Sequence, residues 1–261
     1  MDHDPIRAGR TAETVTRRIE GLILEGALRP GEALLPEREM ALRLNVSRPT
    51  LRDALKALEG RGLLVKRGRA LVVAALGQGS IRDPLIALMA DHSGVADDYL
   101  EFRDIVETSA AGMAAERATA PEIETIRQCV NRIDAAHLSR DPAEEAAADA
   151  DLHIAIYEAS QNLVLLQIMR ALTGILRSDV LRNRQRMFTV PDIRDLLHAQ
   201  HLTIAQAIID RRPDAARAAS HDHLAFVRRA MRDIDAQAAN LDRSLRRLDS
   251  GGLGVGPASR D

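Results

Sequence analysis

Aromatic residues are scarce in this sequence of 261 residues, which contains two tyrosines, three phenylalanines and no tryptophan. A hydrophobic core must therefore be built from Leu, Ile, Val and Ala, and where these recur at i, i+3 and i+4 they predict helices. Glycine and proline cluster in a few places instead of recurring about every ten residues, as they would in an all-β fold. The composition predicts a mainly α protein.

The sequence also lacks the marks of several other classes. One cysteine, Cys129, excludes an internal disulfide framework and a cysteine-rich zinc module, and we expect it to be a small buried hydrophobe. No run approaches the roughly 18 apolar residues of a membrane span. The opening, MDHDPIRAGR, has no apolar stretch of the kind found in secretory signals. We therefore expect a cytoplasmic protein without a membrane partner.

Charge is distributed unevenly along the chain. Residues 1–75 carry 14 Lys and Arg against 10 Asp and Glu, whereas the remainder carries 22 against 28. Lysine itself is nearly absent, since only Lys56 and Lys66 occur. A basic N-terminal part on an acidic body predicts an anionic partner at that end.

Residues 1–75 have the pattern of a winged helix-turn-helix domain. Apolar spacing and helix-start signals predict three helices followed by a β-hairpin that turns at Gly68-Arg69. The helices are expected at residues 11–27, 36–44 and 48–62. This order of elements within about 65 residues is typical of DNA-binding domains whose last helix enters the major groove.

The rest of the chain reads as helical. Residues 76–83 are predicted to be a linker, residues 84–248 a helical domain, and the Gly-rich residues 249–261 a disordered tail. Within the helical domain we expect helices at residues 84–91, 96–118, 121–138, 142–160, 162–186, 192–211 and 213–247. Several of these begin near a proline, which suits the first turn of a helix.

Two groups of motifs resemble known families. LRPGEALLPEREMALRLNVSRPTLRDALKALEGRGLLVKRGR is similar along its whole length to the DNA-binding signature of the GntR family of bacterial transcription regulators. The C-terminal part resembles the FadR-type effector domain, an all-helical antiparallel bundle called FCD. Its marks are LEFRDIVETSAAGMAAERAT, DADLHIAIYEASQN and HAQHLTIAQAIIDRRPDAARAASHDHL. The two resemblances cover residues 11–235 or so.

The resemblance implies a homodimer that binds a palindromic double-stranded DNA operator. It places the DNA contacts at Arg38, Ser47, Arg48, Thr50, Arg52 and Gly68. Many FCD domains hold a divalent metal ion with Asp-x-x-x-His on one helix and two further histidines. The matching positions are Asp149, His153, His201 and His223.

The metal site can also be weighed from the residues alone. An Asp and a His at i, i+4, such as Asp149 and His153, usually form an ordinary surface pair. His201 and His223, however, align with the apolar stripes of their own helices. Three imidazoles and a carboxylate that converge from apolar faces are unfavourable unless a cation satisfies them. Such a ligand set suits zinc, and it also suits nickel, manganese or iron.

The predicted metal site suggests what the protein senses. Arg103 lies on a helix that lines the same cavity in the family, and its guanidinium suits a bidentate clamp on a carboxylate. The alternative role for Arg103 is an ion pair with Glu107, one turn on. PLIALM…LEFRDIVE is similar to lactate- and pyruvate-responsive regulators, which implies a small organic acid, a 2-hydroxy or 2-oxo acid, as the effector.

Three hypotheses follow for the function. The first is a transcription regulator whose operator affinity changes when the acid binds. The second is a metal-dependent enzyme that acts on a small carboxylate, since an open metal can activate water. Against this second hypothesis, no separate general base is evident near the ligands. The third is a metal ion that only stabilises the fold.

Overall fold

The computed structural model describes residues 5–68, 70–74, 93–188, 190 and 192–248, and it is mainly α, as predicted. The chain divides into two compact units. The first is Met1–Ala87 with Leu163–Leu172, and the second is Leu88–Asn162 with Thr173–Asp261. Among the described residues, no helix is both long and apolar enough to span a membrane.

The first unit contains the predicted winged helix-turn-helix. Its N-terminal elements are α1 (Pro5–Leu24), α2 (Glu37–Arg43), α3 (Arg48–Gly60), β1 (Leu64–Arg67) and β2 (Ala70–Val73). The antiparallel β1–β2 hairpin confirms the predicted wing. The first helix starts at Pro5, earlier than the predicted residue 11. It ends at Leu24, before the predicted residue 27, because the chain turns at Gly26, where φ is +80°.

Two local signals fix the ends of the second and third helices. Pro36 is the residue that precedes α2, so the helix begins one residue after the predicted start at residue 36. The third helix ends just before Gly62, whose φ of +72° lies in the left-handed region that favours glycine. A further backbone pairing joins Ala33 to Val72, so the segment before α2 adds to the wing sheet.

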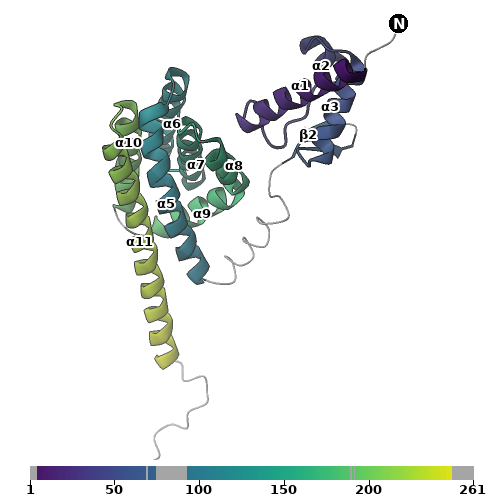
Figure 1. Cartoon of the computed structure of the whole chain (residues 1–261). Coiled ribbons are helices and arrows are strands. Elements are labelled where there is room, and N and C mark those ends of the chain that lie inside the picture. Colours follow the sequence, from purple (N-terminus) through teal and green to yellow (C-terminus); the bar gives the residue numbers. More distant parts are fainter. Residues whose placement is uncertain (1–4, 69, 75–92, 189, 191, 249–261) are drawn as a thin grey trace, which may run out of the picture. The chain divides into compact units, whose positions relative to one another are not determined.

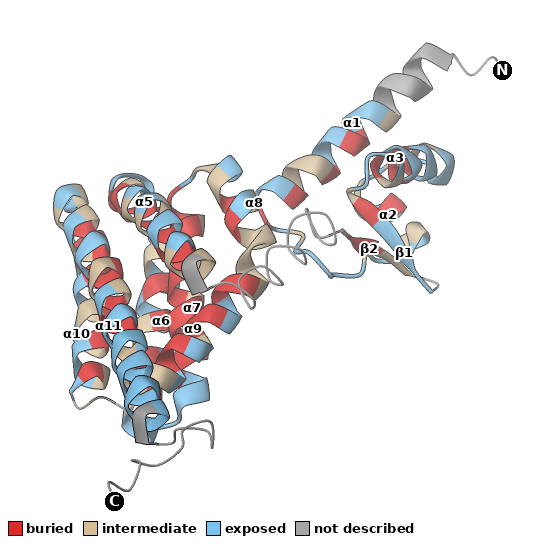
Figure 2. Cartoon of the chain, turned by 90° about the horizontal axis from the view of Figure 1, so that it is seen from below, coloured by how far each residue is buried: buried red, intermediate tan, exposed pale blue. Residues whose placement is uncertain are grey.

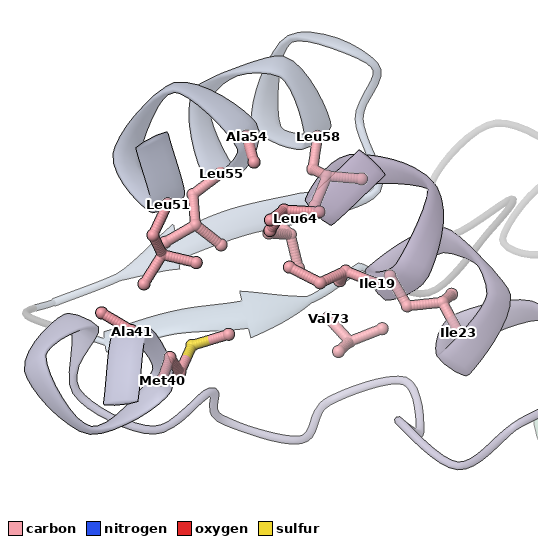
Figure 3. Close-up of a cluster of buried hydrophobic side chains, with 11 residues drawn as sticks. Ile19, Ile23, Met40, Ala41, Leu51, Ala54, Leu55, Leu58, Leu64 and Val73 are labelled. Carbon is pink, nitrogen blue, oxygen red and sulfur yellow. The ribbon is translucent and has the colours of Figure 1, made fainter. Parts of the chain in front are cut away.

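An apolar core holds this unit together (Figure 3). Ile19 of α1, Leu51 and Leu58 of α3, and Leu64 of β1 are all at most 1% exposed. Burying such side chains fully stabilises a fold by about 1.5–3 kcal/mol each. Leu51 and Leu58 share one face of α3, and Val15, Ile19 and Ile23 share one face of α1, so the helical spacing of apolar residues predicts the helical part of this core.

The second unit is a bundle of helices. It comprises α5 (Ser93–Arg117), α6 (Ala120–Ser139), α7 (Pro142–Ala159), α9 (Thr173–Met187), α10 (Ile193–Ile209) and α11 (Pro213–Leu248). Helix starts carry the expected caps: Thr119 and Glu122 form a capping box on α6, and Asp141 accepts a hydrogen bond from Ala143 N at the start of α7. The predicted helix at 84–91, the linker and the tail lie outside the described residues.

One helix prediction was wrong. Residues 162–186 were expected to form one helix, but they form α8 (Leu163–Ala171) and α9, separated at Leu172. Thr173 and Gly174 have low helix propensity and follow the break directly. Helix α8 groups with the first unit, although we had assigned all helices after residue 84 to one domain. The domain boundaries stay a prediction.

Helices α5 and α11 run antiparallel and lie side by side (Figure 1). Arg228 and Arg232 of α11 both donate hydrogen bonds to Asp97 of α5. Residues 235–246 at the end of α11 are exposed, whereas the faces of α7 and α9 toward the bundle are buried (Figure 2). The bundle therefore brings α7, α10 and the first half of α11 together, and these helices carry the predicted metal ligands.

Candidate DNA-binding surface and candidate metal centre

The predicted DNA contacts lie on the exposed side of the first unit. Ser47 caps α3: its Oγ accepts a hydrogen bond from Thr50 N at 3.2 Å and lies 2.7 Å from Thr50 Oγ1. Residues 47–49 at the start of α3 are exposed, and an exposed helix N-terminus attracts phosphate. The two hydroxyl groups form a hydrogen bond with each other, so they stabilise the start of the helix in addition to their predicted role as DNA contacts.

The predicted arginine contacts differ in their surroundings. Arg38 and Arg48 are exposed, and neither forms an ion pair within the part of the chain that the structure describes. Arg52 is exposed and donates to Glu37 Oε2 at 3.1 Å. Gly68 lies exposed at the hairpin turn with φ +61°. These positions form an outward-facing set, and their DNA contacts stay a prediction.

The four predicted metal ligands come together inside the second unit. Ring nitrogens of His153 (α7), His201 (α10) and His223 (α11) all lie within 4.8 Å of one another. Asp149 Oδ1 lies 3.0 Å from His153 Nε2 and 3.2 Å from His201 Nε2. All four residues are buried. The sequence spacing had placed Asp149 and His153 on one face, and the bundle supplies the other two ligands.

Each imidazole is held through its Nδ1 atom. His201 Nδ1 lies 2.7 Å from the Leu197 carbonyl oxygen, which can only accept, so this nitrogen carries the hydrogen. Gln200 Oε1 lies 3.0 Å from His223 Nδ1, and Glu107 Oε2 lies 2.7 Å from His153 Nδ1 in an ion-pair contact that does not have hydrogen-bond geometry. A partner at Nδ1 leaves Nε2 as the lone-pair donor, which is the arrangement that supports metal-binding histidines.

Three atoms at the centre lack hydrogen bonds. Asp149 Oδ1, His153 Nε2 and His201 Nε2 are buried and have no hydrogen-bond partner among the described residues, although they lie close to one another. An unsatisfied buried polar atom costs about 1–3 kcal/mol. A cation at their common point would satisfy all three, so the donor set fits a divalent metal ion.

Protonation at the centre follows from burial and neighbouring charge. Burial lowers the pKa of both His201 and His223, so these rings stay neutral. Burial acts the same way on His153, but the neighbouring carboxylates of Glu107 and Asp149 outweigh it and raise its pKa to about 9. Burial raises the pKa of Asp149, but His201 and Arg184 outweigh it and hold it well below its usual range. A bound cation would therefore displace the proton of His153.

Two buried arginines flank the centre. Arg103 donates to Glu107 Oε1 at 2.7 Å and to Asp179 Oδ2 at 3.4 Å, so the ion pair that we gave as its alternative role is present. Arg184 donates to Asp149 Oδ2 at 2.8 and 3.1 Å, which leaves Asp149 Oδ1 facing the histidines. Both arginines line a cavity of about 20 Å³ beside His223. That is about the space of one water molecule.

Sequence reasoning missed part of this site. Asp179, Asn183 and Arg184 are buried on α9, and the sequence analysis assigned none of them to the site. The signal was their spacing with Leu176 and Met187, because positions separated by three, four, seven and eleven residues share one face of a helix. Polar residues on an otherwise apolar stripe mark a buried polar site.

The other histidines that the structure describes lie outside the centre. His221 is exposed and pairs with Asp104 at 2.9 Å. His198 pairs with Asp134 at 2.6 Å and stacks on His137, with ring centroids 4.2 Å apart. Cys129 is buried, as predicted. His201 and His223 therefore belong to the buried centre, whereas His198 and His221, which lie two or three residues before them in the sequence, do not.

An exposed winged helix-turn-helix and a helical bundle with a buried cluster of histidines and carboxylates together define the class of a DNA-binding transcription regulator. The chain belongs to the GntR family of bacterial regulatory proteins, whose DNA-binding domain matches residues 11–73, and it carries an FCD domain at residues 98–226. Regulators of this family bind DNA operators, and FCD domains bind small-molecule effectors and commonly metal ions.

The chain is similar to several known regulators. It is 39% identical over 235 residues to a regulatory protein of the L-lactate dehydrogenase operon of Escherichia coli K12, covering 88% of this chain and 90% of that relative. It is 31% identical over 236 residues to the Glc operon transcriptional activator of the same strain, covering 89% and 93%. These relatives are regulators, so the chain is a transcription regulator and not an enzyme.

A solved structure agrees with this assignment. Streptococcus agalactiae GntR superposes with a TM-score of 0.54 and 26% identity, covering 84% of this chain and 99% of that one. The resemblance to the GntR family and to FCD is confirmed.

Proposed function

We propose that the chain binds a palindromic operator as a homodimer and that a divalent metal ion, zinc in the first instance, sits between Asp149, His153, His201 and His223. The single observation that supports the metal most is the set of three buried ligand atoms without hydrogen bonds. Nickel, manganese and iron suit the same donors. Operator binding places the action of the protein in the cytoplasm.

The buried carboxylates around the centre are paired with guanidinium groups. Glu107, Glu145, Asp149 and Asp179 contact two buried arginines, Arg103 and Arg184, and two arginines nearer the surface, Arg182 and Arg194. The support for the metal ion is therefore the set of unsatisfied ligand atoms and not an excess of negative charge.

The effector that we propose is a 2-hydroxy or 2-oxo acid with one carboxylate. Its two oxygens would bind the metal ion, while Arg103, Arg184 and Asn183 at the cavity would hold the carboxylate. The name of the L-lactate dehydrogenase operon regulator is consistent with such an acid. Since the cavity of about 20 Å³ is smaller than the acid, Arg184 and its helix must move when the acid enters.

That movement provides the signal. A ligand shifts a conformational equilibrium only through its different affinity for the two states, so the acid and the operator must affect each other's binding by the same factor. Winged helix-turn-helix dimers read two half-sites, and their relative position sets operator affinity. We infer that entry of the acid changes this position.

The experiment uses the full-length dimer and a duplex selected from a random library by the wild-type protein. Operator affinity is measured with lactate, pyruvate and glycolate, before and after chelation and after zinc is restored. We expect one acid to change the affinity by about 5- to 150-fold, only when the metal is present, and Arg48→Ala to abolish operator selection.

Two outcomes would contradict the proposal. If zinc restores thermal stability but no acid changes operator affinity at any concentration, the metal only stabilises the fold. If Arg48→Ala selects the same duplex as the wild type, the assigned DNA surface is wrong.

A further inference from the structure

The only two lysines of the sequence lie in one groove of the first unit. Lys56 comes from α3 and Lys66 from β1, and both line a groove of about 580 Å³ between that helix and the wing. Arg52 and Gly68, two of the predicted DNA contacts, line the same groove. The lysines therefore share this groove with two of the residues to which DNA contacts are assigned.

Like charges are stacked along α3. Arg48, Arg52 and Lys56 follow one another at i, i+4 and i+8, which places them on one helix face, and all three are exposed. Like charges at this spacing destabilise a helix by about 0.2–0.5 kcal/mol per pair. An anion along this face would turn that repulsion into attraction.

The groove is only partly neutralised from within. Lys66 Nζ lies 3.4 Å from Glu59 Oε1, in a pair whose lysine side chain is 72% exposed. Such an exposed pair is weak and easily exchanged for another anion. Lys56 has no ion pair with any other described residue. Lys56 is thus available to bind an anion. Lys66 is paired with the Glu59 carboxylate, which a phosphate group can replace.

We propose that Lys56 and Lys66 grip the sugar-phosphate backbone of one DNA strand, so that the groove sets the register in which Arg48 and Thr50 meet the bases. This assignment rests on the proposed operator binding and adds two contacts that carry no sequence preference. Glu59 opposes them, because its carboxylate faces the same phosphates across Lys66.

The test measures binding of the full-length protein to a duplex of random sequence and to the selected operator over a series of salt concentrations. Each of Lys56→Gln and Lys66→Gln should reduce the slope of log K against log salt by about 0.9, equally for both duplexes. Glu59→Gln should tighten binding to both. Arg17→Gln, which removes an exposed cation of α1 outside this groove, is the matched control and should leave the slope unchanged.

The scarcity of lysine gives a second readout. Apart from the terminal amine, an amine-acylating reagent can modify only Lys56 and Lys66, so mass spectrometry reports on this groove directly. Both lysines should be protected when the duplex is bound. The inference is overturned if both stay reactive in the complex, or if the two lysine variants keep the wild-type slope. If Arg48→Ala still abolishes operator selection in that case, the proposed function stands without this groove.

Discussion

The two units of this chain use charge in opposite ways. In the first unit, Thr16 is the only buried polar side chain among the described residues, and the cations of α3 and the wing are exposed. In the second unit, arginines, carboxylates and three histidines are buried together. Exposed charge suits a long polyanion that arrives from solvent, whereas buried charge suits a small ligand that replaces missing partners. The first unit therefore suits the proposed recognition of DNA at its surface, and the second suits the proposed sensing in its interior.

Removing a metal ligand should have the largest effect. His201→Ala takes away a ring that is fully buried, with its Nε2 facing the centre. We expect the metal content, measured by elemental analysis after equilibrium dialysis against zinc, to fall from one ion per chain to none. His221→Ala is the matched control, because this histidine is exposed and paired with Asp104. Equal metal content in both variants would place the ion elsewhere.

A core substitution in the first unit should leave sensing intact. Leu51→Ala removes a side chain with no exposed surface and should lower the free energy of unfolding of that unit by about 2–5 kcal/mol. Leu42→Ala, at a position 74% exposed, should change it by less than about 0.5 kcal/mol. Chemical denaturation measures both. If Leu51→Ala also lowers the metal content, then the core of the first unit and the buried centre of the second unit are not independent of each other.

The support of the first metal ligand should matter less than the ligand itself. Glu107→Gln keeps the shape of the side chain that faces His153 Nδ1 but removes its charge. Loss of such an orienting carboxylate typically weakens metal binding about 10- to 100-fold. Competition with a zinc indicator measures the change, and Glu116→Gln, an exposed position on the same helix, is the control. An unchanged affinity would mean that Glu107 serves only its contacts with Arg103 and Tyr157.

The smallest expected effect concerns acid stability. Hydrogen bonds from Arg228 and Arg232 hold the pKa of Asp97 well below its usual range. The stabilisation is therefore present above the unfolded pKa of about 3.9, and it is lost as the pH falls toward the lowered folded pKa. Asp97→Asn should lower stability at pH 7, and the difference from wild type should shrink as the pH falls below 4. Thermal melts across this range test it, with Asp98→Asn as control; a difference independent of pH would contradict it.

The sequence predicted the two units unequally well. In the first unit, Leu51, Leu58 and Ile19 repeat at helical spacing, so the periodic pattern alone locates the core. In the second unit, the pattern placed His201 and His223 on inward stripes, but it did not reveal Arg184. A buried arginine is indistinguishable from a solvated one until the carboxylates that pair with it are known, and those come from α7, 35 and 39 residues away.

The break between α8 and α9 shows a second limit. Low propensity at Thr173 and Gly174 permits a break but does not require one, because tertiary contacts decide between a bent and a continuous helix. Gln167 of α8 donates hydrogen bonds to the carbonyl oxygens of Ile23 and Leu24 at the end of α1. Contacts over more than 140 residues of sequence are not visible in local pattern.

X-ray absorption spectroscopy of the zinc-loaded full-length protein tests the central claim most directly. If Asp149, His153, His201 and His223 hold the ion, the spectrum will show three imidazole nitrogens at about 2.0–2.1 Å, their outer-ring scattering, and at least one carboxylate oxygen. A zinc shell of oxygen alone, or one with fewer than two imidazoles, would contradict the account, because the ion would then lie outside the buried centre.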